Sequence, residues 1–223
     1  MTTANGIVAP LESEIPRLRG MIHVVACPLL IATGIVLATQ ADGWRGVSAV
    51  IVMASGYALV FGTSGLYHRW RWSPRVKRIL KHLDHTMIFV GIAFVYTALW
   101  IAVLNGVVAD IMLAYVWCGV VVGTLMKLKY LDARASRHSL AYIAFSLVGL
   151  AVLPGLAQHM GTTGVVLMLG GAVAFMLGAV AFASGRPNPF PRIAGHHEVF
   201  HATTVIGAGL HLAALASVVL RHH

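Results

Sequence analysis

The chain has 223 residues, of which 58% are hydrophobic and only 10% are charged. Soluble domains carry charge on about a quarter of their residues, so this composition excludes an ordinary soluble domain. The formal net charge is nevertheless +9, because basic residues outnumber acidic ones.

Apolar stretches long enough to cross a bilayer recur along the chain. A helix needs about 20 apolar residues to span a hydrocarbon core roughly 30 Å thick. We therefore predict an all-α integral membrane bundle of seven transmembrane helices, at residues 21–39, 47–68, 83–104, 107–126, 139–156, 163–183 and 199–219. Residues 1–20 are expected to form a cytoplasmic tail, and residues 21–223 a single transmembrane domain.

The basic residues indicate how this bundle is oriented. With the N-terminus inside, every Lys and Arg except Arg45 and Arg221 falls in an inner segment. Positive residues are retained on the inside, so the N-terminus is predicted to be cytoplasmic and the C-terminus outside. Short basic loops at a membrane face need no nucleic acid as a partner. The expected partners are membrane lipids, and the expected location is the plasma membrane.

Three polar clusters that are distant in the sequence arrive at the inner face. The second span ends with S-G-L-Y-H, at Ser64–His68, and the third begins with K-H-L-D-H, at Lys81–His85. The seventh begins with H-H-E-V-F-H, at His196–His201. Ionisable groups at the mouth of a membrane span are costly, and each indicates a functional or structural reason. This convergence is the strongest indication of function in the sequence.

The spacing of the histidines favours a metal site. His197 and His201 are four residues apart and share one helix face. Together with His68 they offer three imidazole ligands, and a zinc ion with three protein ligands keeps a position open for water. Asp84 is placed to bind or deprotonate that water, and Ser64 to orient it. The alternative is that these side chains only anchor helix ends at the membrane interface.

The same stretch reads as H-E-x-x-H, the signature of zinc proteases, in which Glu198 would be the general base. Glu198 lies about 100° around the helix from His197 and about 60° from His201, a geometry that H-E-x-x-H enzymes share. No later span supplies the distal carboxylate ligand of such enzymes. We therefore expect the match to be a coincidence of spacing.

The other histidines are assigned more simply. His23 is expected to pack or to make a polar contact between helices, and His211 to make a hydrogen bond in the core. His82 and His85 are either partners of the metal ligands or part of a solvated helix start. His138 is placed in a loop.

At these motifs the sequence resembles the hemolysin III family, bacterial relatives of the progestin and adipoQ receptors. The resemblance extends over nearly the whole chain and includes R-L-R-G-x-x-H at Arg17–His23. It implies a seven-helix bundle with the N-terminus inside. It also implies a zinc ion bound by His68, His197 and His201, with Asp84 and Ser64 supporting a zinc-bound water. Larger relatives, the alkaline ceramidases, hydrolyse lipid amides.

The sequence and this resemblance together predict a zinc-dependent membrane hydrolase that acts on a lipid amide or ester at the cytoplasmic side. Small residues such as Gly170, Ala174 and Gly178 allow close helix contact around an acyl chain, or ordinary bundle packing. One alternative is a lipid sensor without enzymatic activity, in which zinc is structural. A cytolysin, as the family name suggests, and a transporter are the others.

Overall fold

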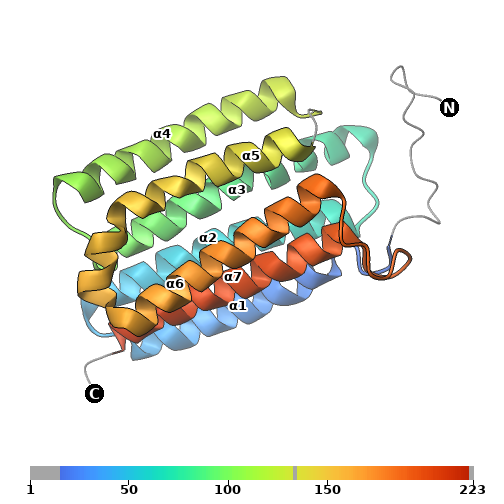
Figure 1. The fold of residues 1–223 in the computed structure, drawn as a ribbon. Helices are drawn as coiled ribbons and strands as arrows, with labels where there is room; N and C mark the ends of the chain where they lie inside the picture. Colours follow the sequence, from blue (N-terminus) through green and yellow to red (C-terminus); the bar gives the residue numbers. More distant parts are fainter. Residues whose placement is uncertain (1–15, 133–134, 221–223) are drawn as a thin grey trace.

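The computed structural model describes residues 16–132 and 135–220, in which helices are joined by short turns and an isolated β-bridge pairs Phe190 with Ala194 (Figure 1). The elements in chain order are α1 (Met21–Gln40), α2 (Gly43–Arg69), α3 (Pro74–Ala102), α4 (Val107–Tyr130), α5 (Ala135–Ser146), the 3₁₀ segment η2 (Leu147–Val152), α6 (Leu153–Ser184) and α7 (His196–Val219).

Six of these helices are long and apolar enough to cross a membrane: α1, α2, α3, α4, α6 and α7. Their outward faces carry large apolar side chains, and Val121 and Leu125 on α4 are each 60% exposed. Contiguous apolar surface of this kind is rare on soluble monomers and suits contact with lipid. The predicted all-α membrane bundle is confirmed, while the number of crossings and the side on which each terminus lies stay predictions.

The predicted fifth span, 139–156, is not one continuous α-helix. It is divided among α5, η2 and the first turn of α6. Within α6, Gly161 has φ 65° and ψ 177°, which is not helical, so the chain bends there before the stretch predicted as the sixth span. A positive φ is available to glycine at little cost. Hydropathy reports composition over a window and does not detect such breaks.

Helix α3 begins at Pro74, nine residues before the predicted start of the third span at 83. Proline is favoured in the first turn of a helix, where its missing N–H has no acceptor to lose. The added turns contain Arg75, Lys77 and Arg78, so a hydropathy window does not recognise them. Asp84 therefore lies well inside α3 rather than at its first turn.

Helix α7 packs along α6 and also contacts α1, α2 and α3, while α2 packs between α1 and α3, and α4 packs on α3 (Figure 1). At one end of the bundle, the backbone N–H of Arg17 donates to the carbonyl of Arg192 at 3.1 Å. At the other, the N–H of Asp42 donates to the carbonyl of Val219 at 3.1 Å. Consequently the first residues of α1 and of α7 lie at the same end of the bundle. The last residues of α2 lie there too.

Candidate metal centre

Three histidines from two helices meet at this end of the bundle. His68 lies in the last turn of α2, and His197 and His201 lie in the first two turns of α7. Each offers a ligand nitrogen, and these nitrogens all lie within 4.8 Å of one another. The Nε2 atoms of His68 and His197 are 3.2 Å apart. The structure thus brings together the three histidines that the sequence singled out.

The donor set fits a zinc ion. Tetrahedral zinc with Zn–N bonds of 2.0–2.1 Å places its ligand nitrogens about 3.3 Å apart, close to the separation of His68 and His197. His201 is only 1% exposed, and its Nδ1 has no hydrogen-bond partner among the described residues. A metal bound there would displace no protein contact of that atom. Imidazole nitrogens also suit copper, iron and nickel, so the donor set by itself does not select zinc.

Asp84 and Ser64 border the histidines. The Oδ2 atom of Asp84 lies 3.7 Å from Nε2 of His68. Ser64 is buried one turn deeper on α2, with its hydroxyl beside the Asp84 carboxylate. The carboxylate of α3 is thus bordered by two polar side chains of α2, Ser64 and His68. All five predicted site residues lie in one cluster, while their chemical roles stay predictions.

Glu198 turns away from the histidines and makes structural contacts. It is 1% exposed, and its Oε1 accepts a hydrogen bond from Nε of Arg19 at 2.5 Å. Its Oε2 accepts from the backbone N–H of Gly195 at 2.8 Å, a contact that caps the start of α7. Both carboxylate oxygens are thus engaged.

Arg19 is brought to Glu198 by a close approach of the chain ahead of α1. Gly20 has φ 76°, and a Cβ built on it would come within 2.8 Å of the Cβ of His68 and 2.9 Å of the backbone nitrogen of Arg69. A side chain at position 20 would therefore be strained and would push directly against the site.

His23 supports the site from α1. Its ring stacks on that of His201, with centroids 4.0 Å apart and planes 9° apart, and on Phe61. Thr204 donates its hydroxyl to the carbonyl of His201, so its oxygen is left to accept from Nε2 of His23 at 3.1 Å. His23 does not belong to the group of three histidines that could hold a metal ion, so it positions the ring of His201 and is not a fourth candidate ligand. The sequence predicted only packing or a polar contact here.

His211 is a core residue, as expected. The N–H of its Nε2 donates to the carbonyl of Met168 at 3.1 Å, and its Nδ1 accepts from the hydroxyl of Tyr57 at 2.8 Å. These bonds join α7 to α6 and α2. The side chain is satisfied, and it needs no ligand to explain it.

His85 and His138 form a second polar cluster, between α3 and α5. His85 bonds through Nδ1 to the carbonyl of Lys81 at 2.7 Å, and its ring lies 5.4 Å from that of His138. His138 is buried on α5 and contacts the amine of the buried Lys127 through a short hydrogen bond. Its predicted loop position was wrong, because a histidine in a short polar stretch does not reveal that it faces a lysine on the preceding helix.

The fold and the site define a multi-pass integral membrane protein with a three-histidine candidate metal centre at one end of the bundle. A family model described as Haemolysin-III related matches residues 13–212, so the chain belongs to this family. Membership and the six apolar helices confirm the predicted multi-pass insertion in the cell membrane.

Two relatives show how similar the chain is to other hemolysin III proteins in sequence. The chain is 24% identical to "Hemolysin-3" of Bacillus cereus over 191 residues, which cover 84% of each protein. It is 27% identical to "Hemolysin-3 homolog" of Bacillus subtilis (strain 168) over 186 residues, which cover 83% of each. No solved structure matches the chain.

Proposed function

We propose that this protein is a zinc-dependent membrane hydrolase acting on a lipid amide or ester. The observation that carries the proposal is the meeting of His68, His197 and His201 with the Asp84 carboxylate 3.7 Å from His68. A metal-ligand cluster with an adjacent carboxylate is the arrangement of metal-assisted hydrolysis. A structural site held by side chains alone would use four protein ligands rather than three.

The chain's own residues have distinct tasks in this mechanism. His68, His197 and His201 hold the zinc ion, which when bound supplies Lewis acidity and activates water. Asp84 accepts a proton from the water that attacks the acyl carbonyl. Ser64 holds the Asp84 carboxylate in place through its hydroxyl, and His23 holds the ring of His201 by stacking.

Metal content of the protein purified in detergent without chelators is the first test. We expect about one zinc per chain, as a single three-ligand site requires, in the wild type and in His196→Ala. His196 is the matched control, because it precedes the ligand pair on α7 and does not belong to the cluster. We expect the metal to be lost from His197→Ala and His201→Ala. A wild type without bound metal would refute the proposal.

Turnover separates the enzyme from a zinc-binding protein. Hydrolysis of an N-acyl sphingosine and of a fatty acyl ester is compared between the wild type and Asp84→Asn. We expect Asp84→Asn to retain zinc and to lose activity by a factor of about 10² or more, as for removal of a positioned proton acceptor. Full activity of this variant would overturn the role of Asp84.

One observation favours a second function, a lipid sensor with structural zinc. The side chains of His68 and Asp84 are largely covered, with only 10% and 16% of their surfaces exposed. In such a protein the histidine variants would lose thermal stability, and neither lipid would be hydrolysed by the zinc-loaded wild type.

A further inference from the structure

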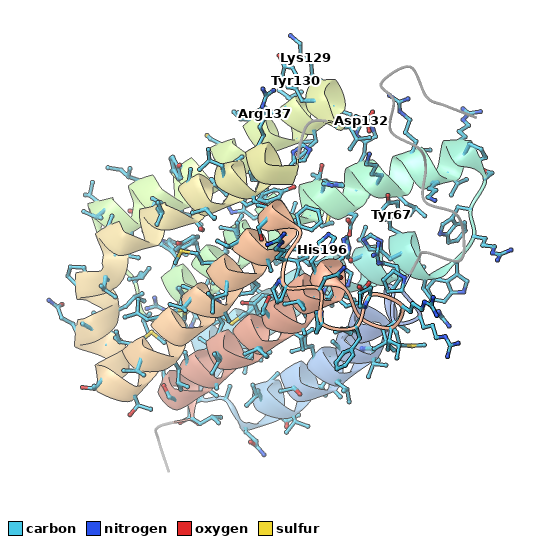
Figure 2. All side chains as sticks on the ribbon, turned by 45° about the vertical axis from the view of Figure 1, so that its right-hand side comes forward. Tyr67, Lys129, Tyr130, Asp132, Arg137 and His196 are labelled. Atoms are coloured by element: carbon cyan, nitrogen blue, oxygen red, sulfur yellow. The ribbon has the colours of Figure 1, made fainter. Side chains whose placement is uncertain are left out.

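A charged hollow lies at the same end of the bundle, where α3, α4 and α5 come together, and its residues take no part in the proposed mechanism. Arg78 on α3, Lys129 on α4 and Arg137 on α5 line it, and its volume is about 320 Å³. Figure 2 shows Lys129, Tyr130, Arg137 and Asp132 gathered at the end of α4, away from Tyr67 and His196.

The hollow has a surplus of positive charge. Its one acidic residue, Asp132, is already paired, since Nζ of Lys81 donates to Oδ1 of Asp132 at 2.6 Å. This hydrogen bond lowers the pKa of the exposed Asp132, so the carboxylate stays charged and engaged. Among the described residues, Arg78, Lys129 and Arg137 make no ion pair. Arg78 also attracts the Asp132 carboxylate, and Nζ of Lys129 lies 5.4 Å from the centre of the Tyr130 ring. Three cations from three helices therefore share the hollow with one carboxylate that Lys81 already holds.

The hollow lies at the end of a candidate membrane span, where lipid headgroups are expected. It lies beyond the apolar part of α4, beside Tyr130, which is half exposed, and Leu128, which is 64% exposed. Tyrosine is enriched at membrane–water interfaces, and leucine here extends the lipid-facing surface of the helix. The buried Leu131 lines the same hollow. A ligand there would have its polar part among the cations and its apolar part against lipid.

We propose that this hollow binds the phosphate headgroup of an anionic phospholipid. Basic pockets between transmembrane helices on the cytoplasmic side suit such headgroups. The positive-inside rule accounts for basic residues on this side of the membrane. It does not account for the placement of three of them around one hollow, in which the Asp132 carboxylate is already paired with Lys81. The residues that line the hollow and the three candidate metal ligands have no member in common.

Native mass spectrometry of the detergent-purified full chain tests the proposal, with phosphatidylglycerol and phosphatidylcholine of identical acyl chains as probes. We expect the wild type to retain phosphatidylglycerol preferentially. In the triple variant R78Q/K129Q/R137Q this preference should fall by about tenfold or more, because each cation near an anionic headgroup adds to its attraction. A single variant, K129Q, should show a smaller fall in the same direction.

The matched control is R17Q/R75Q/R186Q, which removes the same charge from exposed positions at the same end that do not line the hollow. We expect it to keep the preference within about twofold, since it leaves the three hollow cations in place. Equal losses in both triple variants would show a diffuse charge effect and overturn the site. Competition by soluble glycerol phosphate as strong as that by the lipid would overturn the assignment to a lipid. Melting temperatures in detergent without added lipid establish whether each variant is folded. If a triple variant is not folded, the phosphatidylglycerol preference of K129Q tests the proposal.

Discussion

Glu198 shows how one residue can match a catalytic motif and serve another purpose. In H-E-x-x-H proteases the glutamate faces the metal-bound water, whereas here its two oxygens accept from Arg19 and from the backbone of Gly195. The carboxylate is fully buried, so an unpaired charge there would be costly. The expectation that the motif is a coincidence of spacing agrees with these contacts.

Removing either partner of this ion pair is expected to change stability without removing the metal. Arg19→Ala leaves the Glu198 charge buried and without its cation, and should cost about 3–5 kcal/mol of unfolding free energy. Glu198→Gln keeps an acceptor for the Gly195 N–H and leaves the partly exposed Arg19 free to reach solvent, so it should cost only about 1–2 kcal/mol. Unfolding in detergent micelles measures both values, and metal analysis accompanies it. A Glu198→Gln protein that binds zinc but has lost hydrolytic activity would support the hypothesis that Glu198 is the general base of an H-E-x-x-H site.

At the scale of helices, the packing of α6 on α7 depends on glycines that let the two backbones approach. A Cβ built on Gly207 would come within 3.0 Å of the Gly171 carbonyl oxygen and 2.7 Å of the Phe175 ring. Without a hydrophobic force between helices in lipid, such close contact is a main source of association. Of the predicted small residues, Gly178 also faces α7, where its Cβ would meet Thr203.

Two glycines on α7 offer a direct comparison of this packing. Gly207→Ala should lower unfolding free energy by roughly 1–3 kcal/mol, because the added methyl group meets backbone on α6 and overpacks the interface. Gly209→Ala adds its methyl group where no atom lies within 4 Å. It should be neutral or stabilise by up to about 1 kcal/mol, as alanine favours a helix over glycine. Thermal unfolding in the same detergent compares them. Equal melting temperatures would show that α6 moves aside without cost.

For the whole molecule, the relative direction of the first and last helices bears on how often the chain crosses the membrane. The starts of α1 and α7 lie at one end of the bundle, and the turn between α1 and α2 lies beside the end of α7 at the other. Parallel first and last helices require an odd number of crossings. We therefore predict that the stretch formed by α5 and η2 carries the chain across, although it is not a single long helix.

Reporter fusions after Gln158, Pro187 and Leu220 test this topology. With the N-terminus inside and seven crossings, alkaline phosphatase should be active after Gln158 and Leu220 and inactive after Pro187. Green fluorescent protein at the same three positions should show the opposite pattern. An inactive phosphatase after Gln158 would show that α5 and η2 do not cross, and the same reversal at all three positions would show an inverted protein.

The membrane class, the position of most spans and the meeting of three polar clusters followed from the sequence alone. Transfer of apolar residues into lipid is a local, additive effect, so hydropathy detects it residue by residue. The end of one span and the start of the next lie at the same membrane face. This places His68, Asp84 and His197 at similar depth before any packing is known.

Only the tertiary structure decided how these residues meet and what surrounds them. Arg19 and Glu198 are 179 positions apart, and His23 and Thr204 are 181 apart. Such partners depend on how each helix is rotated and how closely it approaches its neighbours, which is decided by glycines such as Gly20 and Gly207 acting through packing. The polar turns of α3 and the burial of His138 were missed for the same reason. Helix rotation and close contact are properties of pairs of helices, and no single stretch of sequence contains them.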